Sequence, residues 1–237
     1  MKKLILTLTA LLISGVGHAA PPALTHVPVD HIFAPTGFHD HENTQVVVTG
    51  FLPNLCHKAP KADVIVEGRE VRIDLQAFHY HATNEFCAPV LVPFVETVDV
   101  GLLDRGEYDV KVNSNTQYER RSMVQVDEYA SSAISDYVFA NVHSVSKSGH
   151  GREVLLQGYN PSDCFELKEV KYDHNKNDTY SVYPVLKQVS DFCPKKMVPF
   201  TYEFEVPQDL DRHQVLLHVK GMDGRSVNAI FNNIATH

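Results

Sequence analysis

The sequence predicts an all-β protein made of two tandem antiparallel β-sandwich domains, each closed by one disulfide bond. Three observations predict this fold class. A set of glycine, proline, cysteine and valine positions occurs twice in the same order, short alternating strands follow one another between turn residues, and each copy holds two of the four cysteines. A sandwich suits this pattern because each strand buries only its alternate residues against the facing sheet.

The repeat sets the number of domains. Its second copy follows the first at a shift of about 107 residues, and a near-constant shift over a long stretch indicates an internal duplication. The recurring positions are Gly50, Pro53 and Cys56 with Gly158, Pro161 and Cys164; Phe86-Cys87 with Phe192-Cys193; Val92-Pro93-Phe94 with Val198-Pro199-Phe200; and Leu103-Asp104-Arg105 with Leu210-Asp211-Arg212. We expect a signal peptide over 1–19, a first domain over 20–126, a linker over 127–136 and a second domain over 137–237.

The first copy shows the period of half-buried strands. Val71, Ile73 and Leu75 alternate with polar residues, and the preceding Glu67-Gly68-Arg69-Glu70 predicts a hairpin turn. Pro93 favours an edge strand or a bulge, because proline lacks the amide that a central strand needs. The expected strands of this copy cover residues 45–49, 64–66, 71–75, 90–100 and 108–112.

The second copy follows the same plan. A polar loop over Asp173–Asp178 joins two strands, and Tyr202, Phe204 and Val206 alternate with polar residues. The expected strands cover residues 154–156, 167–172, 179–185, 202–206, 215–219 and 226–230.

The stretch from Gly101 to Val112 reads GLLDRGEYDVKV. It resembles a pattern common in secreted immunoglobulin-like sandwich domains, where a leucine, a glycine, a tyrosine and alternating valines mark the last turn and the final strands. The resemblance implies two tandem immunoglobulin-like sandwiches and implies no activity. The chain contains no tryptophan, so the buried tryptophan of antibody domains is absent.

The cysteines are expected to pair within each domain, as Cys56–Cys87 and Cys164–Cys193. The two members of each pair have nearly the same separation, so the repeat selects this pairing among those possible. An exported chain enters an oxidising compartment, where such pairs form disulfides. A zinc site and a redox pair are the alternatives, and the absence of a Cys-x-x-Cys motif argues against both.

The first residues have the features of a secretory signal peptide. Lys2 and Lys3 form a charged start, an apolar run covers 4–16, and small residues at 17–19 place the cleavage before Ala20. No later run of about twenty apolar residues occurs, so we expect no transmembrane segment in the mature chain. The expected location is the periplasm or the outside of the cell.

The chain is acidic, with 21 Lys+Arg against 29 Asp+Glu and a formal net charge of −8 at pH 7. Cleavage would also remove Lys2 and Lys3. Nucleic acid and anionic membrane surfaces both require a basic face, so neither is an expected partner.

Two histidine pairs in the first copy are candidate metal ligands. In a strand, His79 and His81 would project from one face, about 7 Å apart, and His39 and His41 form a second His-x-His beside acidic residues. Imidazole and carboxylate groups are ligands of Zn(II) and Cu(II). The alternative is that both pairs are solvated surface residues. A metal site that the fold required would be expected in both copies, but the second copy has no histidine over 184–190, where the first has His79 and His81. Any zinc or copper site is therefore expected in the first domain alone, and no other cofactor is expected.

Tyrosines of the second copy are the other candidate surface. Tyr180 and Tyr183 are the candidate partner-binding residues, because tyrosine gives a large contact area with few rotatable bonds. The alternative is that these side chains lie in the core or pack across strands.

No catalytic motif is present: the chain lacks a Gly-x-Ser-x-Gly elbow, a phosphate-binding glycine loop and a His-Glu-x-x-His helix. We therefore expect no catalytic residues and no enzyme. The favoured interpretation is an exported binding or scaffold protein of the cell envelope that recognises an unknown protein or glycan through loops and edge strands. The alternatives are a metal-binding protein, an enzyme without a linear motif, and a pilus-assembly-type chaperone, which lacks matching cysteines in both halves.

Overall fold

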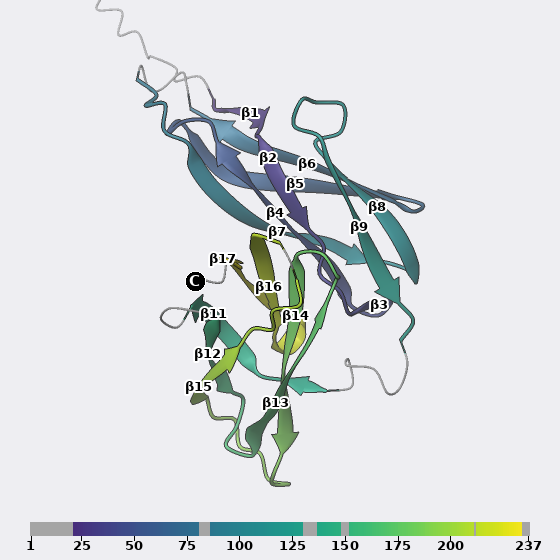
Figure 1. Cartoon of the computed structure of the whole chain (residues 1–237), viewed down its shortest axis with the longest axis vertical. Coiled ribbons are helices and arrows are strands. Elements are labelled where there is room, and N and C mark those ends of the chain that lie inside the picture. The colour runs from purple at the N-terminus through teal and green to yellow at the C-terminus, as the bar shows by residue number, and fades with distance from the viewer. Residues whose placement is uncertain (1–20, 81–85, 130–136, 148–151, 211, 234–237) are drawn as a thin grey trace, which may run out of the picture.

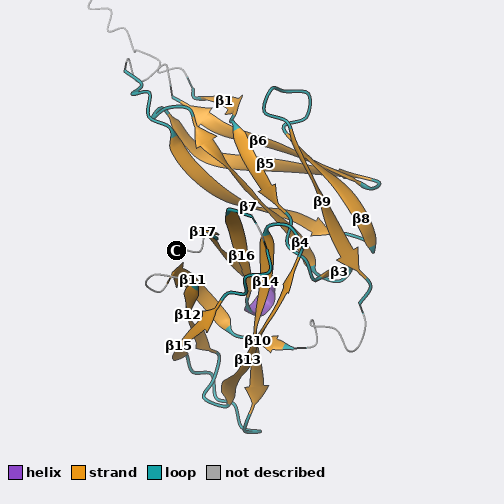
Figure 2. Ribbon diagram, viewed as in Figure 1, coloured by secondary structure: helices purple, strands orange, loops and turns teal. Residues whose placement is uncertain are grey.

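The computed structural model describes residues 21–80, 86–129, 137–147, 152–210 and 212–233. These residues form two β-sandwiches that follow one another along the chain (Figure 1), which confirms the predicted fold class. Strands dominate the described residues, and their helical element is a short 3₁₀ turn at Met222–Gly224 (Figure 2).

The first sandwich packs a six-stranded sheet on a three-stranded sheet. The six-stranded sheet contains β1 (Ala23–His26), β3 (Phe38–His39), β5 (His57–Glu67), β6 (Glu70–His79), β8 (Gly106–Val112) and β9 (Arg120–Asp127), and the three-stranded sheet contains β2 (Val29–Phe33), β4 (Asn43–Leu52) and β7 (Val92–Leu102). Val71, Ile73 and Leu75 of β6 are fully buried against Val46 and Val48 of β4, so the predicted alternation marks the core.

The second sandwich packs a five-stranded sheet on a three-stranded sheet. The five-stranded sheet contains β10 (Val138–Phe139), β13 (Phe165–His174), β14 (Thr179–Gln188), β16 (Gln214–Lys220) and β17 (Ser226–Asn232), and the three-stranded sheet contains β11 (Asn141–Lys147), β12 (Glu153–Asn160) and β15 (Val198–Glu205). Its core is formed by Leu156, Val182, Leu217 and Val219 with the large ring of Tyr180.

Every strand of the first sandwich except β3 has a counterpart of the same pairing in the second, with β1 matching β10. β5 and β6 match β13 and β14, β8 and β9 match β16 and β17, and β2, β4 and β7 match β11, β12 and β15. Most pairs are antiparallel, but β3 pairs with β9, β6 with β8, and β14 with β16 in parallel. These parallel pairs depart from the purely antiparallel prediction. Between β6 and β8 the chain crosses to the other sheet through β7, and between β14 and β16 it crosses through β15. No hairpin therefore joins the two strands of either pair, and they are free to run in parallel.

The turn and edge predictions are confirmed. β5 ends at Glu67 and β6 begins at Glu70, and Gly68 at the turn has φ +62°. This left-handed conformation costs glycine nothing, which explains its position there. Pro93 lies in β7, an edge strand of the three-stranded sheet, where a missing amide donor is tolerated.

Close backbone packing explains the glycine at the start of the repeated motif. A Cβ added to Gly50 in β4 would lie 2.1 Å from the carbonyl oxygen of Pro28 and 2.6 Å from the ring of Phe94. At Gly158 the corresponding distances are 2.2 Å to a backbone oxygen of β11 and 2.8 Å to the ring of Phe200. Glycine is therefore required at both positions, and the recurring glycine and phenylalanine of the motif form one packing unit.

Both predicted disulfides form. Cys56 pairs with Cys87, and Cys164 pairs with Cys193, with a Cα–Cα distance of 5.4 Å in each case. Each bond closes a loop between the start of one strand of the larger sheet and the segment that leads to the opposite sheet.

The two sandwiches meet through unlike faces. The outer face of the β14–β16–β17 sheet lies on the outer face of the β2–β4–β7 sheet, where Phe33 and Val47 pack against Leu216. Ser181 Oγ donates a hydrogen bond to the carbonyl oxygen of Thr36 at 2.9 Å across this contact. The two domains are thus joined by a packed apolar patch with hydrogen bonds around it.

Equivalent positions on the larger sheet differ between the two copies according to what covers them. In the first copy they are charged and at least partly exposed, and Lys111 pairs with both Glu70 and Asp109. In the second copy they are small or uncharged and are buried against the first sandwich. The equivalent pairs are Glu70 and Thr179, Arg72 and Ser181, Asp74 and Tyr183, Asp109 and Leu216, and Lys111 and His218.

Candidate functional site

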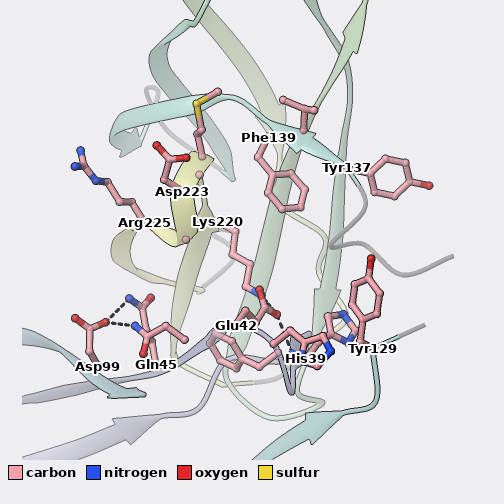
Figure 3. A pocket seen from close by; sticks show the side chains of 17 residues that line it. His39, Glu42, Gln45, Asp99, Tyr129, Tyr137, Phe139, Lys220, Asp223 and Arg225 are labelled. Atoms are coloured by element: carbon pink, nitrogen blue, oxygen red, sulfur yellow. Dashed lines mark hydrogen bonds and ion pairs between the residues drawn. The ribbon is translucent and has the colours of Figure 1, made fainter. Parts of the chain in front are cut away.

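A cleft of about 770 Å³ opens where the two sandwiches meet, and we call it the interdomain cleft (Figure 3). Its volume lies in the range of small-ligand pockets. It is lined by Phe38, His39, His41, Glu42, Asn43, Gln45, Asp99, Tyr129, Tyr137, Val138, Phe139, Lys220, Gly221, Met222, Asp223, Gly224 and Arg225. Because both domains contribute residues, the cleft exists only when the two domains of the chain are docked.

An ion pair between the buried Lys220 and the partly buried Glu42 joins the domains at the floor of the interdomain cleft. Lys220 Nζ at the end of β16 donates to Glu42 Oε1 at 2.8 Å and to the carbonyl oxygen of Gly37 at 2.7 Å. The same ammonium lies 4.4 Å from the ring centroid of Phe38, a cation–π contact. Burial lowers the pKa of Lys220, and the neighbouring Glu42 carboxylate opposes that shift. The floor is therefore fixed and nearly neutral.

One wall presents a carboxylate held by two amides. Asn43 Nδ2 and Gln45 Nε2 on β4 both donate to Oδ1 of Asp99 on β7, at 2.7 and 2.6 Å. The amide oxygens are also engaged, since Asn43 Oδ1 accepts from the backbone of Gly101 and Gln45 Oε1 accepts from Ser226 Oγ. Asp99 itself is exposed. Its orientation is therefore set by its neighbours, while its second oxygen makes no hydrogen bond within the described residues.

The facing wall is aromatic. Tyr129, Tyr137 and Phe139 follow one another along it in Figure 3. Tyr137 is held by Lys171, which donates to its hydroxyl at 3.0 Å and lies 4.2 Å from its ring centroid. Phe139 contacts the ring of Tyr183 with centroids 5.9 Å apart. This wall therefore offers aromatic surface, and its Tyr137 and Phe139 rings are held in place by Lys171 and Tyr183.

The 3₁₀ turn after β16 closes the third side. Asp223 and Arg225 are exposed there, and no ion pair joins either of them to another residue in the described ranges. Met222 contributes the apolar part of this side. A donor and an acceptor of opposite charge thus stand at the mouth of the interdomain cleft.

The structure brings one of the predicted histidine pairs to this cleft. His39 in β3 is buried, and neither of its ring nitrogens has a hydrogen-bond partner among the described residues. His41 is exposed, contacts the ring of Tyr129 with centroids 5.4 Å apart and lies 3.6 Å from the carboxylate of Asp40. The two imidazoles thus differ in environment although they are two residues apart.

The other predicted pair is only half described. His79 stacks on His57, with ring centroids 4.4 Å apart and planes 11° apart, and His81 lies outside the described residues. Burial, and next the nearby His79, lower the pKa of His57. Within the described ranges, no group of three or more His, Cys, Asp or Glu side chains is placed to hold a metal ion. Zinc or copper binding stays a prediction.

The tyrosine prediction needs a correction. Tyr180 and Tyr183 are fully buried, so neither forms an exposed surface for an external partner. Tyr180 points into the second core, where burial and hydrogen bonding to Asp209 raise its pKa to about 12. Tyr183 lies on the opposite side of β14, and its hydroxyl donates to the carbonyl oxygen of Thr36 at 3.2 Å. The alternative of a core or packing role holds for both.

Sequence reasoning missed most of the interdomain cleft. Tyr137, Phe139 and Arg225 belong to short elements around the domain junction, and no linear motif connects them. The sequence feature that could have indicated this cleft is the position of Tyr137 and Phe139, which directly follow the expected linker over 127–136.

The comparisons with known proteins give one match, to part of the first sandwich. The family described as the ORF11 beta-sandwich domain matches residues 46–121, which run from β4 into β9 of the first sandwich. No curated protein matches the chain. No solved structure matches it. Among the described residues, no helix has the length and apolar character needed to cross a membrane.

Proposed function

We propose that this chain is a non-enzymatic binding module of the cell envelope or of the exported proteins, and that the interdomain cleft receives part of a protein or glycan partner. The observation that carries the proposal is the cleft itself, with walls from both sandwiches held in a fixed relation. The β-sandwich family match and the two disulfides support a rigid framework of the kind that binding modules use.

The contacts between the domains argue for a preformed cleft. Close to it, the Lys220–Glu42 pair and the Tyr183–Thr36 hydrogen bond tie the sandwiches together, and His31 Nε2 lies 2.6 Å from Asp178 Oδ2 further along the same joint. A preformed site loses less conformational entropy on binding, which favours affinity. Loops and an edge strand supply much of the lining, as expected for recognition.

The lining chemistry also favours binding over catalysis. Asp99 accepts two amide hydrogen bonds and Lys220 pairs with Glu42, so both side chains are held in place by their neighbours. Binding requires only shape and complementary polar groups, and the interdomain cleft provides both.

The test uses the immobilised mature protein and an envelope extract of the cells that produce it. Bound material is analysed separately for protein and for sugar. An Arg225→Trp/Asp99→Arg variant fills and recharges the interdomain cleft, and an Arg121→Trp/Asp63→Arg variant makes the same two changes on β9 and β5, outside its lining. We expect a partner that the wild type and the control retain and that the cleft variant loses. Equal retention by all three proteins would overturn the placement of the site.

A further inference from the structure

We infer that the ligand group received by the interdomain cleft is a neutral, hydroxyl-rich saccharide segment. This inference rests on the proposed function and adds the chemical class of the ligand. It follows from the arrangement of the walls, from the balance of charge and from the orientation of Asp99.

The two long walls have the two characters that a sugar ring requires. A pyranose has C–H faces that are apolar and an edge of hydroxyl groups that both donate and accept hydrogen bonds. Tyr129, Tyr137 and Phe139 offer flat apolar surface on one side, and the Asp99 carboxylate stands on another (Figure 3). Figure 3 places the Asp99 carboxylate and the aromatic side chains at opposite ends of the lining, with Lys220 and Glu42 between them, so a segment of several sugar units is needed to contact both walls.

The charge of the lining argues against an anionic ligand. Lys220 is cancelled by Glu42 at 2.8 Å, and Asp223 and Arg225 carry opposite charges on the same side. A phosphate or a polyanionic chain requires several uncompensated cations, and the lining provides none beyond Arg225. The lining holds Lys220 and Arg225 against Glu42, Asp99 and Asp223, so it carries one negative charge in excess, and a small cationic group would also find a partner there. A neutral polar group needs no counter-charge and can use the same carboxylate as a hydrogen-bond acceptor.

Asp99 is oriented as a receptor for hydroxyl groups. The amides of Asn43 and Gln45 both bond to one of its oxygens, which leaves the other available to a ligand. A carboxylate fixed in this way accepts from hydroxyl donors without reorganising, and its charge strengthens the bond. Arg225 can donate to hydroxyl oxygens from the opposite side.

The experiment is a calorimetric titration of the oxidised mature chain with neutral trisaccharides: maltotriose, cellotriose, mannotriose and triacetylchitotriose, with 3′-sialyllactose as the charged comparison. We expect at least one neutral trisaccharide to bind with a Kd below about 1 mM. Asp99→Asn keeps the shape of the side chain and removes its charge, and Tyr129→Ala removes aromatic surface. Each should weaken binding at least about tenfold.

Matched controls locate the effect. Asp63→Asn and Tyr172→Ala make the same chemical changes at exposed positions outside the interdomain cleft, and should leave the Kd unchanged. Circular dichroism of each variant confirms that the fold is retained. Binding that survives both cleft substitutions, or binding of 3′-sialyllactose alone, would overturn the inference.

The two proposals fail in different ways. If no neutral trisaccharide binds, while the extract still yields a partner that the Arg225→Trp/Asp99→Arg variant loses, the saccharide inference is wrong and the binding function stands. If the extract partner binds the cleft variant and the wild type equally, and no trisaccharide binds, both are wrong.

Discussion

The ammonium of Lys220 and the carboxylate of Glu42 form an ion pair across the junction of the two sandwiches, at 2.8 Å. Lys220 is only 8% exposed. A buried charge is costly unless a partner compensates it, so the two residues stabilise the joint only as a pair.

Removing one member of this pair should destabilise the protein more than removing both charges. Glu42→Gln leaves the buried ammonium without its carboxylate and should cost about 3 kcal/mol or more in free energy of unfolding, measured by urea denaturation. The Glu42→Gln/Lys220→Met double variant removes the unpaired charge and should recover part of that loss. A single variant as stable as the wild type would contradict this account.

Stability should fall as the pH falls from about 6.5 to about 4, because of His218. Complete burial, the first cause, lowers the pKa of this side chain from 6.5 to about 4, although a hydrogen bond with Asn228 opposes the shift. In that window the unfolded chain binds a proton that the native His218 excludes, and stability decreases by about 3 kcal/mol in total.

The measurement for this prediction is the urea midpoint of wild type and His218→Gln at several pH values between 4 and 7. Glutamine can keep a hydrogen bond to Asn228 but does not titrate. The difference between the two proteins should shrink or reverse toward pH 4. Parallel curves for the two proteins would show that another group causes the acid sensitivity.

The duplicated glycines give a prediction with an internal replicate. Gly50→Ala and Gly158→Ala each force a methyl group against a backbone oxygen and a phenylalanine ring. Each should lower the free energy of unfolding of its own domain by about 1–3 kcal/mol. Gly221→Ala is the control, since its added Cβ would meet no atom closer than 3.4 Å. Thermal unfolding of the three variants compares them directly, and a tolerated Gly50→Ala would mean that β2 can move away.

Reduction of the disulfides should destabilise both domains by similar amounts. The bonds join residues 31 and 29 apart in sequence, and closing loops of that size contributes about 3–4 kcal/mol each in the chain-entropy model. Cys56→Ser/Cys87→Ser and Cys164→Ser/Cys193→Ser variants, followed by denaturation without reductant, separate the two contributions. A much larger loss in one domain would show that its cysteines do more than close a loop.

The strand pattern of β6 and β8 in the first sandwich could be predicted because each of these strands has one buried and one more exposed face. Val71, Ile73 and Leu75 show this alternation, and Gly68 and Pro93 mark a turn and an edge that the structure contains. The paired cysteines could be assigned because the repeat restricted their pairing.

The tyrosines of β14 could not be assigned from the sequence, because burial there depends on the other domain. Residues 179–186 are buried on both sides, one by the second core and one by the first sandwich. An isolated sequence does not show which face a neighbour covers. The interdomain cleft has the same origin, since its lining comes from segments around 38–45, 99, 129, 137–139 and 220–225, which only the docking of the sandwiches brings together.

The unlike faces at the joint have a consequence for self-association. The face of the β11–β12–β15 sheet that matches the docking face of the first sandwich carries Glu153, Glu203 and Glu205, where the first sandwich has Gln45, Thr97 and Asp99. The outer face of the six-stranded sheet in the first sandwich, which matches the docking face of the second sandwich, is charged as well. A further chain that docked by the same geometry would have to bury these charges, which is costly. These charged faces therefore oppose growth into fibres by repeated docking of this kind.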